Sequence, residues 1–158
     1  MKATATSLHT INIPGFTTSS GSAGDIQLSY QLFGKSLHTA PVVLVNHALT
    51  GNSDVAGPTG WWSALIGKGK CIDTERYTVL CFNIPGNGYD GFVIDNYKDF
   101  IARDIALLFL KGLEHLGIQK LYATIGGSLG GGLAWEMAAL NPELTQHLIP
   151  VASDWKST

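Results

Sequence analysis

The chain has 158 residues, of which 45% are hydrophobic and 14% are charged, and its formal net charge is −2. This length fits one domain, and the near-neutral charge argues against nucleic acid or an anionic membrane as the main partner. No apolar run reaches the roughly 18 residues that a membrane-spanning helix needs, so no membrane span is expected.

The amino-terminal residues and the cysteine content indicate the cellular compartment. Residues 1–6 lack the apolar core of a signal peptide. The only cysteines are Cys71 and Cys81, which show no metal-type spacing, and Cys81 lies in an apolar strand pattern typical of a buried thiol. A reducing cytoplasmic location is therefore expected, and no metal site is predicted.

The first part of the chain predicts two strands. Residues 8–16 and 26–33 alternate apolar and polar side chains with a period of two. The Ser/Thr/Gly-rich residues 17–24 between them are typical of a turn. We expect the two strands to pair antiparallel and to form one edge of a sheet.

The remaining chain alternates strand and helix patterns. Apolar runs typical of strands buried on both faces lie near 42–46, 77–83, 121–125 and 147–151. Helices are predicted over 61–66, from about Tyr97 to Leu116 before Gly117, and over 133–140. This alternation predicts an α/β fold, in which a mostly parallel sheet carries helices on both faces and an antiparallel amino-terminal edge.

A glycine-rich turn follows the strand predicted at 121–125. Gly126 and Gly130 flank Ser128 with the Gly-x-Ser-x-Gly spacing of a nucleophile elbow, and a helix pattern follows at once. Glycines suit this turn because the serine is strained and its neighbours must leave clearance. Ser128 is therefore predicted to be a catalytic nucleophile at a helix amino terminus, where backbone N–H groups favour an oxyanion. The alternatives are a connection without chemistry or a phosphate loop, and no Gly-Lys-Ser/Thr follows to favour the latter.

Residues 46–53 form a second chemical stretch, directly after a buried strand. In folds built around such an elbow, this loop supplies the second oxyanion donor. We predict that the donors are the backbone N–H groups of Leu49 and Leu129. His47 could act as a base, but in this kind of fold the histidine follows the serine in the chain. His47 is therefore predicted to brace the loop by hydrogen bonds.

Residues 82–91 form a third stretch, which should lie at the same sheet edge as Ser128 because it also follows a strand. Its glycines allow close backbone approach, although a plain surface turn remains an alternative. Asp90, Asp95 and Asp99 lie in and after it, but their spacing does not match a calcium loop. They are interpreted as solvated carboxylates near a helix start.

These pieces together resemble the amino-terminal half of a homoserine O-acetyltransferase, in the α/β-hydrolase superfamily. The resembling pieces are residues 46–51, 60–62 with 65–67, 72–77 and 126–131, and the likeness covers roughly residues 26–153. The resemblance implies acyl transfer from acetyl-CoA or another acyl-CoA, through Ser128, to the hydroxyl of homoserine or a similar alcohol in methionine biosynthesis. It implies small-molecule substrates, no bound cofactor, and a homodimer for the full-length enzyme.

The resemblance also implies that part of the catalytic machinery lies elsewhere, because the family's acid, histidine and helical lid come after later strands. His147 opens a strand at the wrong end of the sheet, and Asp154 has no histidine to orient. We therefore expect residues 1–158 to form a single partial α/β-hydrolase domain, an inactive fragment with the nucleophile and oxyanion hole but without the base.

Two other functions remain open. Residues 84–88 are more like the loop of ordinary serine hydrolases than the longer glycine-rich insertion of the acetyltransferases. This favours an esterase or thioesterase. The missing base leaves a non-catalytic binding module as the third reading.

Overall fold

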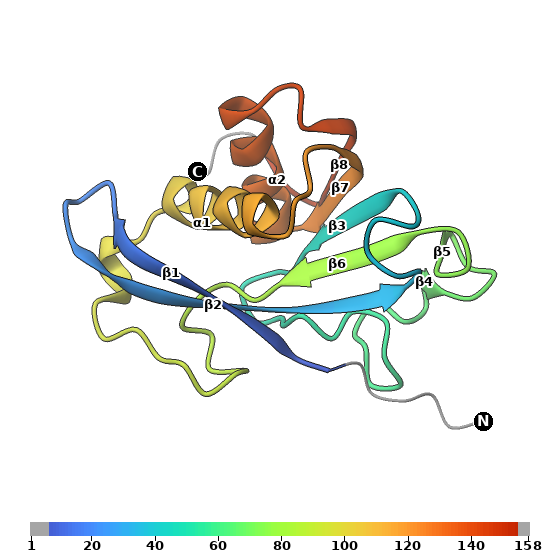
Figure 1. The fold of residues 1–158 in the computed structure, drawn as a ribbon, viewed down its shortest axis with the longest axis horizontal. Helices are drawn as coiled ribbons and strands as arrows, with labels where there is room; N and C mark the ends of the chain where they lie inside the picture. Colours follow the sequence, from blue (N-terminus) through green and yellow to red (C-terminus); the bar gives the residue numbers. More distant parts are fainter. Residues whose placement is uncertain (1–6, 155–158) are drawn as a thin grey trace.

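A six-stranded mixed sheet forms the centre of the computed structural model, which describes residues 7–154 (Figure 1). The strand order is β1-β2-β6-β3-β7-β8. Strand β2 pairs antiparallel with both β1 and β6, whereas β6, β3, β7 and β8 run parallel to one another. The predicted parallel core and antiparallel edge are confirmed. The strands are β1 (His9–Thr17), β2 (Ala23–Gly34), β3 (Val42–Asn46), β6 (Thr78–Phe82), β7 (Leu121–Gly127) and β8 (Thr145–Val151).

The central strands β3 and β6 are buried along their whole length, as their continuous apolar runs predict. Their side chains alternate between two separate hydrophobic clusters, one on each face of the sheet. Leu44 and Leu80 belong to the first cluster, and Val45 and Cys81 belong to the second. The buried thiol predicted at Cys81 is confirmed, and the thiol of Cys71 is exposed.

Both α-helices of the described residues lie on the same face of the sheet, where they pack against each other (Figure 1). They are α1 (Ala102–His115) and α2 (Leu129–Leu140). The opposite face is covered by the irregular residues 52–66, with Val55 and Ile66 fully buried against it. The expectation of helices on both faces therefore holds for one face only. No helix within residues 7–154 is long and apolar enough to cross a membrane.

The helix predicted over 61–66 is wrong. The carbonyl of Trp62 accepts hydrogen bonds from the N–H groups of Leu65 and Ile66, which closes a single turn. The turn ends there because Ile66 enters β4 (Ile66–Gly67), a two-residue strand that pairs parallel with β5 (Ile72–Asp73). Strand pairing thus replaces the second helical turn.

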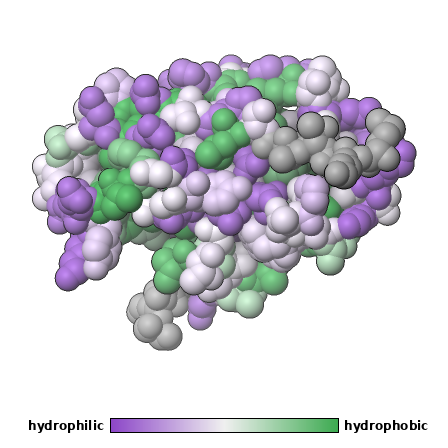
Figure 2. Space-filling model, turned by 90° about the horizontal axis from the view of Figure 1, so that it is seen from below, coloured by the Kyte–Doolittle hydropathy of each residue, from purple (hydrophilic) through white to green (hydrophobic). Residues whose placement is uncertain are grey.

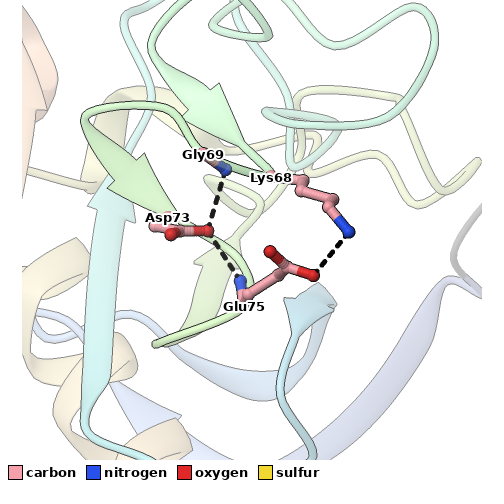
Figure 3. Close-up of polar contacts among 4 residues, drawn as sticks. All are labelled: Lys68, Gly69, Asp73 and Glu75. Atoms are coloured by element: carbon pink, nitrogen blue, oxygen red, sulfur yellow. Dashed lines mark hydrogen bonds and ion pairs between the residues drawn. The ribbon is translucent and has the colours of Figure 1, made fainter.

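The connection from β4 to the residues after β5 is held by one carboxylate (Figure 3). Asp73 accepts hydrogen bonds from the N–H groups of Gly69 (3.0 Å) and Glu75 (2.9 Å), and these bonds lower the pKa of its carboxyl. Lys68 and Glu75 form an exposed ion pair at 2.7 Å beside it. This short hydrogen-bonded unit leads the chain into β6.

The helix predicted from Tyr97 begins later than expected. A 3₁₀ turn, η1 (Tyr97–Asp99), is separated from α1 by extended backbone at Phe100 and Ile101. The Asp104 carboxylate accepts the N–H of Ile101 (3.0 Å), which caps the first turn of α1. At the other end Gly117 takes a left-handed φ of 67°, as its sequence position predicts.

Asp104 also ties α1 to the turn between β1 and β2. Its carboxylate accepts the N–H (2.8 Å) and the hydroxyl (2.6 Å) of Ser19. Burial by itself raises the pKa of the Asp104 carboxyl, but the bonds from Ser19 and Ile101 outweigh it and lower the pKa. The β1–β2 hairpin is thereby fixed beside the residues that lead into α1.

On the face of the molecule seen in Figure 2, hydrophobic residues reach the surface in separate patches between hydrophilic ones.

We predict that Asp104→Ala lowers the free energy of unfolding by about 2 kcal/mol at pH 7, because three hydrogen bonds to a buried carboxylate are lost. Since the folded pKa is lowered, this stabilisation is present above the ordinary aspartate pKa of about 3.9 and is lost as the pH falls through the folded pKa. Urea unfolding at a series of pH values measures it. The difference from wild type should shrink below about pH 4.

Asp95→Ala is the matched control, because this carboxylate is exposed. An Asp104→Ala variant as stable as Asp95→Ala at pH 7 would contradict the role assigned to the buried carboxylate.

Candidate active site

Ser128 lies between the end of β7 and the start of α2, with φ 52° and ψ −120°. This backbone conformation is costly for a residue with a side chain. The Ser128 N–H donates to the carbonyl of Val151 (2.9 Å), and its own carbonyl accepts the N–H of Gly131 (2.9 Å). The side chain is exposed at the carboxyl edge of the parallel strands. The sequence therefore forms the strand–turn–helix that the Gly-x-Ser-x-Gly spacing predicts.

The elbow glycines stand where no side chain fits. A Cβ atom at Gly126 would overlap the carbonyl of Gly130, and a Cβ atom at Gly130 would overlap the carbonyl of Asn46. The start of α2 is thus pressed against the end of β3. This close approach brings the loop after β3 next to the elbow.

Leu49 and Leu129, the two predicted oxyanion donors, line the same cavity of about 240 Å³. Among the hydrogen bonds of residues 7–154, neither of their backbone N–H groups is a donor. Leu129 is the first residue of α2, where free N–H groups are expected. The fold therefore brings the two predicted donor residues together beside one cavity.

His47 is fully buried and joins the loops after β3 and β6. Its Nε2 accepts the N–H of Ile84 (2.9 Å), which assigns the proton to Nδ1, and Nδ1 donates to the carbonyl of Ala48 (2.7 Å). Burial lowers the pKa of the imidazole, against a smaller opposing effect of the bond to Ala48. Both ring nitrogens are engaged, so His47 is a neutral link between the two loops.

The other four histidines lie away from the elbow. His147 pairs with Ala123, four residues before the end of β7, which is about 13 Å along the strand. His9 lies on β1, four strands from β7 in the sheet order, or about 19 Å. His115 ends α1, and His38 lies beside Gly117 just beyond that end. None of these four residues is placed beside Ser128.

A buried polar network beneath the site was not foreseen from the sequence. The side chain of Asn83, just after β6, accepts the N–H of Ser53 (2.8 Å) and donates to the hydroxyls of Ser29 (2.8 Å) and Ser53 (3.0 Å). Asn87 donates to Asn83 (3.2 Å) and to the carbonyl of Gly51 (3.3 Å). The only signal was an asparagine directly after a buried strand.

The aspartates in and after the third stretch stay near the surface, and Asp99 accepts the hydroxyl of Ser22 (2.5 Å) from the turn between β1 and β2. Asp90 accepts the N–H of Phe92 (2.9 Å), and Asp99 accepts the side-chain amide of Asn96 (2.9 Å). Across residues 7–154 no group of three or more His, Cys, Asp or Glu side chains could hold a metal ion.

Comparison with known proteins gives the same fold. The sequence model of the family described as alpha/beta hydrolase fold matches residues 41–158. The chain belongs to the α/β-hydrolase family. The homoserine O-acetyltransferase of Desulfotalea psychrophila is 36% identical over 152 residues, which cover 82% of this chain and 39% of the relative. The resemblance to homoserine O-acetyltransferases is thereby confirmed.

Solved α/β-hydrolase structures include both acyltransferases and esterases. The homoserine O-acetyltransferase from Staphylococcus aureus has a TM-score of 0.83 and 28% identity, covering 98% of this chain and 49% of its own. Esterase E22 has a TM-score of 0.81 and 30% identity, covering 94% and 48%. The chain spans about two fifths of the length of the first curated relatives and about half of these solved chains.

We predict that Gly130→Ala lowers the free energy of unfolding by about 3 kcal/mol or more, because the added methyl group overlaps the Asn46 carbonyl and must displace β3 or α2. Thermal and urea unfolding measure the change. Gly132→Ala, in the same helix, is the control, because its Cβ atom would meet nothing within 4 Å. That variant should gain up to about 1 kcal/mol from helix propensity, and equal effects of the two substitutions would contradict the close approach.

We also predict that Ser128→Gly raises the free energy of unfolding by about 1 kcal/mol. The relief of backbone strain is worth about 1–3 kcal/mol. This gain exceeds the extra entropic cost of ordering a glycine on folding, which is about 0.5–1 kcal/mol. Urea unfolding gives the value. Ser128→Ala removes the hydroxyl but keeps the strain, so it should show no such gain, and a gain of equal size in both variants would point to the hydroxyl instead.

Proposed function

We propose that this chain supplies the nucleophile and oxyanion donors of an acyltransferase of the homoserine O-acetyltransferase type. The single observation that carries the proposal is the strained elbow at Ser128, beside a cavity lined by Leu49 and Leu129. A serine in this conformation persists only where the surrounding structure enforces it, and such strain gathers at catalytic positions.

In the proposed reaction, Ser128 Oγ bonds to the carbonyl carbon of an acyl-CoA thioester. A base outside this chain takes the hydroxyl proton, and the N–H groups of Leu49 and Leu129 stabilise the oxyanion, at about 3 kcal/mol for each donor. The C–S bond then breaks, and the thiol leaves with the proton. The hydroxyl of homoserine, or of a similar alcohol in methionine biosynthesis, attacks the acyl-serine, and Ser128 regains its proton.

His47 has a supporting part in this proposal. Its two hydrogen bonds hold the loop of Leu49 against the loop that begins at Ile84. A neutral imidazole with both nitrogens engaged cannot also accept the Ser128 proton. Since no histidine within residues 7–154 is placed as the base, we infer that the base and its acid partner come from the rest of the fold, and the 158-residue chain alone should not turn over.

A serine hydrolase of the same fold is the second candidate. The similarity to esterase E22 favours it, together with the short loop at Pro85 and Gly86 that lines the cavity. The two candidates differ in the acceptor, because a transferase must hold an alcohol and keep water out.

We predict that the 158-residue chain is not labelled by a fluorophosphonate probe at neutral pH, because no histidine of the described residues 7–154 is placed to act as a base for the Ser128 hydroxyl. Mass spectrometry of the intact chain and its peptides measures labelling. Fusion to the part of the Desulfotalea psychrophila relative that follows the matched region should restore labelling at Ser128 and acetyl transfer from acetyl-CoA to homoserine. Ser128→Ala in the fusion is the control and should do neither.

Hydrolysis without transfer by the fusion would favour the esterase. Labelling of the unfused chain at Ser128 would show that a base is already present, and His47 would be the first residue to replace. A labelled fusion in which Ser128→Ala changes nothing would overturn the nucleophile assignment.

A further inference from the structure

The cavity beside the two oxyanion residues is apolar. Besides Leu49 and Leu129, its walls come from the loop after β6, from the residues before α1 and from the first turn of α1. None of the described residues that line it is charged. Its main apolar side chains are Ile84, Ile94, Phe100 and Ile105. We propose that this cavity binds the alkyl chain of the acyl donor and selects acyl groups longer than acetyl.

The volume supports this assignment. The cavity measures about 240 Å³, whereas an apolar protein cavity of about 150 Å³ is large enough to hold benzene. An acetyl group, with a single methyl beyond its carbonyl carbon, would leave most of this space empty. A linear chain of about six carbons fills it better, and each buried methylene strengthens binding about fourfold. The proposal rests on the acyl-serine function proposed above and names its donor class.

The lining also excludes the other parts of the substrates. The phosphates of coenzyme A and the ammonium and carboxylate groups of homoserine are charged, and burying a charge against apolar walls without a partner is costly. The pantetheine arm of coenzyme A is uncharged but carries amide and hydroxyl groups, which are costly to bury without hydrogen-bond partners. The acyl chain is therefore the only wholly apolar, flexible part of either substrate. With its carbonyl at the N–H groups of Leu49 and Leu129, the chain extends directly into the cavity that these residues line.

Ile105 is the side chain best placed to set the length limit. It lies in the first turn of the rigid helix α1 and is only partly buried, so its outer part faces the cavity. Two other lining residues, Ile94 and Phe100, are backed by the β1–β2 hairpin, where the ring of Phe16 stacks on Phe100 with centroids 6.4 Å apart. The cavity thus has one wall on a helix and one wall backed by the sheet edge.

The test uses the 158-residue chain and the acetyl, butanoyl, hexanoyl and octanoyl thioesters of N-acetylcysteamine. Without a base these thioesters should bind without being consumed, and amide NMR shifts of Leu49 and Leu129 report their dissociation constants. We expect hexanoyl to bind at least about tenfold more tightly than acetyl. Ile105→Phe should remove this preference by filling the cavity, and Ile94→Ala should extend it to octanoyl.

Ile101→Phe is the matched control, because Ile101 is 53% exposed and lies outside the cavity lining. It should keep the preference of the wild type. Equal dissociation constants for the four thioesters in the wild type, or a preference for hexanoyl over acetyl that survives Ile105→Phe, would overturn the proposal. If only the proposed acyl-serine function is wrong, the result differs. Binding of the thioesters would then still depend on chain length, but the fused enzyme would remain unlabelled at Ser128.

Discussion

The close approach of α2 to the end of β3 is the contact on which the site depends. The backbone of Gly130 occupies the space beside the Asn46 carbonyl, and no larger residue fits there. Asn46 is itself fully buried, and within the described residues its side-chain oxygen has no hydrogen-bond partner. The loop of Leu49 meets the elbow of Ser128 at this contact.

Two sets of buried hydrogen bonds hold the loops that leave this contact. His47, which is fully buried, joins the loop after β3 to the loop after β6. The side chain of Asn83, also buried, links Ser53 to Ser29 on β2. Buried polar groups are costly when only some of their hydrogen bonds are made. This network therefore favours the one loop conformation in which these bonds form over other loop conformations. The loop that carries Leu49 is thus positioned by the buried side chains of His47 and Asn83.

The sequence predicted those parts of the fold that depend on local pattern. Strands β3, β6 and β7 follow from continuous apolar runs, and the elbow follows from glycine spacing between a strand and a helix. Strand β8 was also expected to be buried on both faces, but none of its residues is buried. The sequence did not predict contacts between distant segments. Asp104 binds Ser19, 85 residues away, and Asn83 binds Ser29, 54 residues away. No periodicity records such pairs. The helix expected over 61–66 failed for a related reason, because a pairing between two short strands outweighed a local helix pattern.

The strain at Ser128 is sustained because the elbow is held from both sides. On one side α2 packs on β3 through Gly130, and on the other β8 provides the Val151 carbonyl that accepts the Ser128 N–H. The chain beyond β8 also passes close by, since a Cβ atom at Gly131 would lie 2.5 Å from that of Ser153. A turn enclosed in this way cannot relax by moving either flank alone. The position of the serine is therefore set by backbone packing within this chain.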